Sequence, residues 1–224
     1  MHERAEATQC LVWTDRKSKR HSRAPPNRAR PVCPMATPQL KIACLLERYY
    51  NFSLESTLQD IGFADENVNF VKPVSPSDDV VTGTLNAADY EWAAQHASVW
   101  RACAAGDSAM LIFQENVTFS ASCSNVLEAT KALVTLAAEQ TDGDARVLML
   151  SGNGAVPGQS SSYELSRLHS VSHAIAYVLW PKAASKLVDS LPLDGSLTAF
   201  IGRHVEDGGI VAVLASPPLA ECTS

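Results

Sequence analysis

The chain has 224 residues, of which 46% are hydrophobic and 19% are charged, a composition typical of a folded domain with an ordinary core. Its net charge of -6 is unevenly spread, because residues 1–34 hold eight basic and three acidic side chains, whereas residues 35–224 hold ten basic and 21 acidic ones. This acidic body excludes a broad nucleic-acid-binding surface, and no apolar run reaches the roughly 18–20 residues that span a bilayer.

Residues 1–34 form a basic segment ahead of the body. They contain no apolar h-region and therefore do not fit a secretory signal. Their Arg-rich composition leaves three interpretations open: a disordered tail, an organelle targeting segment, and a misassigned start upstream of Met35. We expect a single domain over residues 35–224, and the sequence does not assign a compartment.

The first half of the body predicts strands and helices in turn. Residues 41–46 are a short apolar run that predicts a buried strand, 54–61 predict a helix, and 67–71 predict a second strand. Pro and Ser in residues 73–79 predict a loop. Residues 86–105 predict a longer helix, because Trp92, His96 and Trp100 recur at helical spacing and Gly106 follows the end.

The second half continues the alternation. Residues 109–113 predict a buried strand that leads directly into residues 114–116, and 127–139 predict an amphipathic helix. A strand at 146–150 precedes a Gly- and Ser-rich loop at 151–162. A strand at 172–180, a helix from Pro181 to about residue 191 and a strand at 211–215 complete the series. This order predicts an α/β architecture with a mostly parallel, mixed sheet flanked by helices.

Seven different short segments follow one another along the chain, at residues 42–48, 90–100, 111–117, 146–152, 176–187, 191–197 and 211–219. Together they resemble glycosyltransferase family 25, which includes bacterial lipooligosaccharide (LPS) biosynthesis enzymes and animal collagen galactosyltransferases. The resemblance covers roughly residues 40–222. Leu111-Ile112-Phe113-Gln114-Glu115-Asn116-Val117 stands where the family has Leu-Ile-Leu-Glu-Asp-Asp-Val. Two of the three family carboxylates are therefore amides in this chain.

The resemblance implies the GT-A fold, a nucleotide-sugar-binding α/β type. It also implies sugar transfer from a nucleotide sugar, expected to be UDP-linked, to a hydroxyl group of a glycan or protein acceptor. Such enzymes usually hold Mn²⁺ or Mg²⁺ at a strand end, where the cation neutralises the leaving pyrophosphate. Glu115 is then the expected metal ligand, and Gln114 and Asn116 are expected to contact the metal or nucleotide. The alternative is that residues 114–116 only end a strand and start a turn.

Three further residues are candidates for this site. Asp194, in the loop Pro192-Leu193-Asp194-Gly195, is the candidate general base that takes the acceptor's proton; the alternative is a turn-forming Asp. Arg48 has the planar donors that suit a diphosphate, with a surface salt bridge as the alternative. His173 precedes a predicted strand and could reach the site, or serve a structural role.

The functional expectation is thus an inverting glycosyltransferase with a weakened metal site. A catalytically inactive family member that acts as a binding or partner domain is the main alternative. A third interpretation is an α/β binding protein outside the family. His96, on the apolar side of its helix, is predicted to be a hydrogen-bonded core residue, and Cys44 and Cys103 are predicted to be inert core thiols.

Overall fold

A computed structural model of the chain describes residues 39–47, 58–63, 66, 68–75, 77, 79–82, 87–119, 125–140, 145–152 and 163–222. All of these residues belong to one compact unit, Thr37–Ser224. The predictions for residues 1–34, for Arg48 and for most of the loop at 151–162 lie outside the described residues, as does the beginning of the helix predicted at 54–61.

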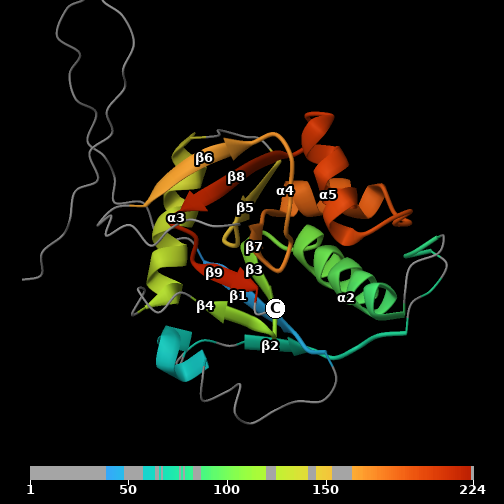
Figure 1. Ribbon diagram of the computed structural model, residues 1–224, viewed down its shortest axis with the longest axis horizontal. Helices are drawn as coiled ribbons and strands as arrows, with labels where there is room; N and C mark the ends of the chain where they lie inside the picture. Colours follow the sequence, from blue (N-terminus) through green and yellow to red (C-terminus); the bar gives the residue numbers. More distant parts are fainter. Residues whose placement is uncertain are drawn as a thin grey trace, which may run out of the picture. The chain divides into compact units, whose positions relative to one another are not determined.

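A seven-stranded mixed sheet forms the centre of this unit (Figure 1). In chain order its strands are β1 (Leu40–Leu45), β2 (Val68–Val71), β3 (Ala109–Gln114), β5 (Arg146–Met149), β6 (Glu164–Leu168), β7 (Ala176–Leu179) and β8 (Val211–Ser216). Across the sheet the order is β2-β1-β3-β7-β5-β8-β6. β1 is parallel to β2 and β3, and β5 is parallel to β8, whereas β7 and β6 are antiparallel to their neighbours. The predicted α/β architecture is confirmed.

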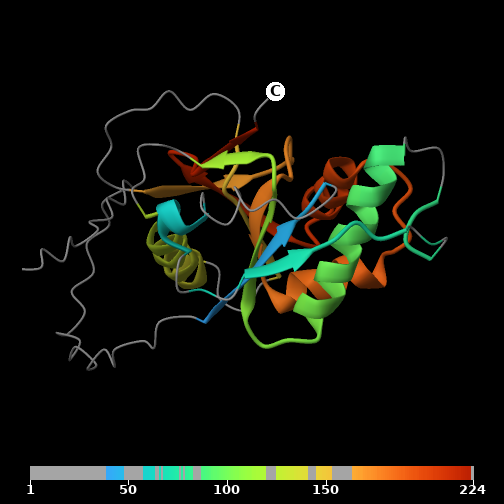
Figure 2. The same cartoon turned by 90° about the horizontal axis from the view of Figure 1, so that it is seen from below.

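Helices cover both faces of the sheet, as the two views show (Figures 1 and 2). On one face lie α2 (Ala87–Ala104), α4 (Pro181–Asp189) and α5 (Leu197–Glu206). On the other lie α3 (Val126–Gln140), the short helical turn η1 (Gln59–Phe63) and a two-stranded sheet of β4 (Val117–Phe119) and β9 (Ala220–Cys222). We call these the α2 face and the α3 face. No helix among the described residues is long and apolar enough to cross a bilayer.

The central strands alternate strictly between the two faces. In β3, Met110 and Ile112 pack into the α2 core, whereas Leu111 and Phe113 pack into the α3 core. Successive side chains of a strand point to opposite faces, so a strand with cores on both faces must be apolar throughout. This double burial accounts for the unbroken apolar runs from which the strands were predicted.

The structure also corrects and extends the predicted elements. The strand predicted at 172–180 is only Ala176–Leu179, because polar residues such as Ser172 and His173 lead into it. α5 was not predicted, although Ser196 begins it in the usual way, by accepting a hydrogen bond from the Ala199 N–H at 3.3 Å. β4, β6 and β9 were not predicted either.

Candidate functional site

The carboxyl ends of β1, β2 and β3 meet at one edge of the sheet, and the predicted triplet lies there. Two backbone hydrogen bonds continue the pairing beyond the strand ends. The Leu46 N–H donates to the Val71 carbonyl at 2.9 Å, and the Glu115 N–H donates to the Leu45 carbonyl at 2.9 Å. This carboxyl edge is where open α/β sheets usually bind ligands.

The antiparallel strand β7 brings its own N-terminal segment to the same edge. The Gln114 N–H donates to the Ile175 carbonyl at 3.0 Å, and the Leu150 N–H donates to the Ala176 carbonyl at 3.0 Å. His173, which is half-buried, lies two residues before Ile175. The backbone pairing thus brings the segment that contains His173 to the end of β3, and the predicted role of His173 at the site stays a prediction.

The triplet is divided between the inside and the outside of the unit. The Gln114 side chain is buried and faces α2, where its Nε2 lies 3.5 Å from Nε2 of His96. Glu115 is half-buried and Asn116 is exposed, and both form the turn between β3 and β4. Burial raises the pKa of the Cys44 thiol to about 12, and the charge of Glu115 contributes to this shift. Because its N–H bonds to the Leu45 carbonyl, Glu115 lies beside the end of β1.

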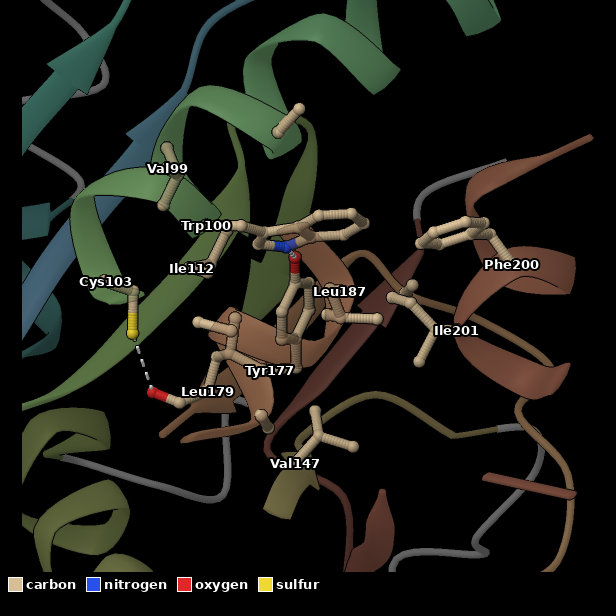
Figure 3. Packing of buried hydrophobic residues seen from close by; sticks show 14 of the residues in the cluster. Val99, Trp100, Cys103, Ile112, Val147, Tyr177, Leu179, Leu187, Phe200 and Ile201 are labelled. Carbon is tan, nitrogen blue, oxygen red and sulfur yellow. Dashed lines mark hydrogen bonds between the residues drawn. The ribbon is translucent and has the colours of Figure 1, made fainter. Parts of the chain in front are cut away.

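Gln114 joins a buried polar cluster, which we define as Gln114, His96, Tyr177 and Trp100. His96 Nδ1 lies 2.7 Å from the Tyr177 hydroxyl oxygen, and the Trp100 indole N–H donates to that same oxygen at 2.9 Å. Figure 3 shows the indole nitrogen directed at this hydroxyl group. The rings of His96 and Tyr177 stack, with centroids 5.7 Å apart. The prediction that His96 is a hydrogen-bonded core residue is confirmed.

Burial sets the charge state of this cluster. Desolvation lowers the pKa of His96 from its usual 6.5 to about 3, so the imidazole ring is neutral near pH 7. Burial likewise raises the pKa of the Tyr177 hydroxyl, so this group stays protonated. Gln114 thus contacts the cluster through the uncharged ring of His96. Its inward position leaves Glu115 and Asn116 as the members of the triplet that face outward.

Gln95 is a second buried amide at this edge that was not assigned from the sequence. It is 1% exposed, and its Nε2 donates to the Leu46 carbonyl at 2.8 Å. Its Oε1 has no hydrogen-bond partner among the described residues. Tyr177 was not assigned either, although it lies within a segment that resembles the family. For both residues the available signal was a polar group placed in an otherwise apolar run.

Asp194 lies in the exposed loop between α4 and α5, on the α2 face. The loop is fixed by the backbone of Leu193, whose N–H donates to the Val80 carbonyl at 2.8 Å. The Asp194 carboxylate accepts two hydrogen bonds from Arg203, from Nη1 at 2.7 Å and from Nη2. These bonds hold the pKa of Asp194 below its usual range. The described side-chain partner of Asp194 is thus Arg203 of α5.

A divalent cation would find few fixed ligands at the carboxyl edge. In the described part of the chain, no group of three or more His, Cys, Asp or Glu side chains is gathered around a common point. Glu115 and Asn116 offer one carboxylate and one amide oxygen. Such a set fits Mg²⁺ or Mn²⁺ that is bound chiefly by substrate phosphates, because Mg²⁺ is commonly held by one or two carboxylates plus phosphate oxygens.

Comparison of the sequence with protein-family models found no match, and a search of curated proteins found no significant match. What the structure itself shows is an α/β unit with a seven-stranded mixed sheet flanked by helices.

Proposed function

We propose that this chain is a GT-A-like glycosyltransferase that binds a nucleotide sugar at the carboxyl edge of β1, β2 and β3, with weak catalytic activity. The observation that carries the proposal is the division of the triplet. Gln114 is anchored inside by His96, and this anchoring places Glu115 and Asn116 in the turn at the ligand-binding edge of the sheet. The sequence of residues 111–117, which resembles the family 25 motif, is the reason for proposing sugar transfer as the reaction.

The groups at the edge have separate roles in this proposal. The Glu115 carboxylate and the Asn116 amide oxygen would hold Mn²⁺ or Mg²⁺, and the metal supplies neutralisation of the departing pyrophosphate. His173 lies two residues before Ile175, whose carbonyl pairs with the Gln114 N–H, and in this proposal it would contact the nucleotide. Gln114 supports these residues from inside and does not contact the ligand itself.

Asp194 is the proposed base, and its surroundings explain why transfer would be slow. A general base works best when its pKa lies near the working pH. The two hydrogen bonds from Arg203 shift the pKa of Asp194 in the opposite direction. The acceptor's hydroxyl proton would therefore move to a poorly basic carboxylate, unless Arg203 first moves away from Asp194.

The same ion pair favours a second candidate function, a nucleotide-sugar-binding or partner domain without turnover. Arg203 bonds to both carboxylate oxygens of Asp194. Among the described residues of the carboxyl edge, no buried Asp or Glu is present to serve as the base in place of Asp194. Under this alternative the edge still binds the nucleotide sugar, but Asp194 serves only to fix the loop before α5.

Calorimetry on the full chain with UDP and UDP-sugars, with and without Mn²⁺, tests the binding site. We expect Mn²⁺ to strengthen binding and Glu115→Gln to weaken Mn²⁺-dependent binding by about tenfold or more, because even residues that support a metal contribute 10–100-fold. Glu206→Gln, at an exposed position on α5, is the matched control. Absence of nucleotide binding under both conditions would contradict both the transferase and the nucleotide-binding alternative.

Two further variants separate the candidates. Asn116→Asp should strengthen Mn²⁺-dependent binding about tenfold by restoring a charge at an exposed position. For turnover, release of UDP from a UDP-sugar is compared between the wild type and Asp194→Asn. Loss of release in the variant supports the transferase, whereas sugar-nucleotide binding with no release in either protein supports the non-catalytic domain.

A further inference from the structure

The hydroxyl group of Tyr177 has two ring-nitrogen neighbours, and their chemistry fixes the direction of both hydrogen bonds. The indole N–H of Trp100 can only donate, so Tyr177 accepts from it at 2.9 Å. The hydroxyl hydrogen then needs an acceptor, since a buried unpaired donor is costly. His96 Nδ1, at 2.7 Å, is the acceptor that the described contacts provide.

This direction determines the tautomer of His96. The ring is neutral, so it carries one hydrogen, and an Nδ1 that accepts from Tyr177 leaves that hydrogen on Nε2. Nε2 faces the side-chain amide of Gln114 at 3.5 Å. An N–H group requires an acceptor, and the acceptor of a glutamine side chain is its oxygen. A half-turn of the amide places Oε1 towards the ring and Nε2 away from it.

The same half-turn accounts for an unpaired atom nearby. Gln114 is the strand partner of Leu45, and the next residue, Leu46, accepts a hydrogen bond from Gln95 Nε2 at 2.8 Å. Gln95 of α2 thus bonds to the backbone at the end of β1, and Gln114 stands at the end of the neighbouring strand β3. Gln95 Oε1 is buried without a partner, and the outward-turned amide nitrogen of Gln114 is a donor of the type that it needs, directly or through one water.

We propose that Tyr177 is a positioning residue, whose hydroxyl group holds His96 as the Nε2–H tautomer, fixes the Gln114 amide and thereby sets the turn that presents Glu115. Tyr177 acts through His96 and Gln114 and touches no ligand. Its effect on ligand binding rests on the proposed nucleotide-sugar site, but its effect on the tautomer and the turn does not.

Long-range ¹H–¹⁵N NMR correlation on the full, ¹⁵N-labelled chain tests the first step. We expect the His96 signals of a ring protonated at Nε2 and unprotonated at Nδ1, near pH 7. A ring protonated at Nδ1 would overturn the proposal, because His96 would then donate to Tyr177 and Gln114 would donate to His96. This measurement needs no substitution and so does not depend on a variant that folds.

Tyr177→Phe tests the second step, because it removes the hydroxyl group and keeps the ring. We expect loss of the single His96 tautomer and shifted backbone amide signals for Glu115 and Asn116. Thr130→Val is the matched control, since it removes a buried hydroxyl group from α3 on the opposite face. Unchanged tautomer and turn signals in Tyr177→Phe would overturn the proposal.

Calorimetry with UDP-sugar and Mn²⁺ adds the functional step. We expect Tyr177→Phe to weaken binding about tenfold, and Thr130→Val to leave it unchanged. Wild-type affinity in Tyr177→Phe would overturn the positioning role in binding. If the wild type itself binds no nucleotide, the proposed function fails, and the tautomer and the turn signals still decide whether Tyr177 positions the turn.

Discussion

The two faces of the sheet satisfy their buried polar groups in different ways. On the α2 face, a group of polar side chains bond to one another across elements: His96 of α2 contacts Tyr177 of β7 and Gln114 of β3. Gln95 of the same helix bonds instead to the Leu46 carbonyl. On the α3 face, polar side chains bond to the backbone of one helix. Thr130 donates to the Val126 carbonyl at 2.8 Å, and Arg146 donates to the Ala137 carbonyl at 3.3 Å.

The packing around these groups differs as well. Between the strands and α3, Phe113 contacts Phe119 edge to face, with centroids 5.3 Å apart, and Phe63 lies 6.0 Å from Phe113. Apolar rings tolerate small shifts of one element against another, whereas a chain of hydrogen bonds between three elements does not. The α2 face should therefore respond to protonation and to loss of single polar atoms, and the α3 face mainly to lost volume.

The largest expected effect is that of acid on the α2 face. Below pH 6.5 the unfolded chain binds a proton at His96, whereas the folded chain does so only near pH 3. Stability from this group is therefore fully present above pH 6.5 and falls as the pH drops, by about 3 kcal/mol at pH 4. Urea unfolding of the wild type between pH 7 and pH 4 measures the slope.

His96→Gln removes this titration, so its stability should depend less on pH over the same interval, although it is less stable than the wild type at pH 7. The exposed His169 supplies the control, since His169→Gln should keep the wild-type slope. If His96→Gln and the wild type show equal slopes, protonation of the buried histidine is not what weakens the α2 face in acid.

Next in size is the Tyr177 hydroxyl group. Tyr177→Phe leaves the Trp100 N–H and one His96 nitrogen without their partner in a buried site. We expect a loss of about 2 kcal/mol in the free energy of unfolding at pH 7, the cost of leaving a buried polar group unsatisfied. Denaturant unfolding followed by Trp fluorescence measures it, and a loss below ~0.5 kcal/mol would contradict the role of the hydroxyl group.

A buried hydroxyl group on the α3 face should matter less. Thr130→Val replaces Oγ1 with a methyl group of similar shape, and the Val126 carbonyl that it contacts belongs to the same helix. We expect a change of less than about 1 kcal/mol, because neither a large cavity nor an orphaned side-chain donor results. A cost equal to that of Tyr177→Phe would remove the contrast between the faces.

The smallest effect on stability is expected at the exposed Asp194–Arg203 pair. Both side chains are about half-exposed, at 56% and 48%, so solvent screens their attraction. Asp194→Asn and Arg203→Met should leave the urea midpoint nearly unchanged. Arg203→Met should, however, raise the pKa of Asp194 by removing its donors, which ¹³C NMR titration of the carboxyl carbon detects. An unchanged titration of the Asp194 carboxyl group in Arg203→Met would mean that Arg203 does not lower the pKa of Asp194.

The central elements could be predicted because local pattern determines them. β1, β3 and β5 are doubly buried and therefore apolar, and α2 carries His96 and Trp100 at helical spacing. The edge strand β6 could not be predicted in this way, since Glu164, Ser166 and Arg167 are exposed and interrupt any apolar run. The antiparallel direction of β7 depends on its connections and leaves no mark in a four-residue apolar segment.

The site was predictable only in its position along the chain. The place of residues 114–116 at a strand end followed from the apolar run before them, and the structure agrees. The contacts of Gln114 could not be foreseen, because they join residues far apart in the sequence. Gln114 is 18 residues from its partner His96, and His96 is 81 residues from its partner Tyr177. For the same reason, the pairing of Asp194 with Arg203 depends on where α5 begins, and α5 was not predicted.

The two-residue repeat of β3 has a consequence for where in the triplet a carboxylate could be introduced. Met110, Ile112 and Gln114 share the side that faces α2. An acidic side chain at position 114 would therefore face His96 and not a ligand at the edge of the sheet. Position 116, in contrast, is exposed and lies in the turn after β3. If the proposed metal site exists, an added carboxylate would therefore be placed at Asn116 and not at Gln114.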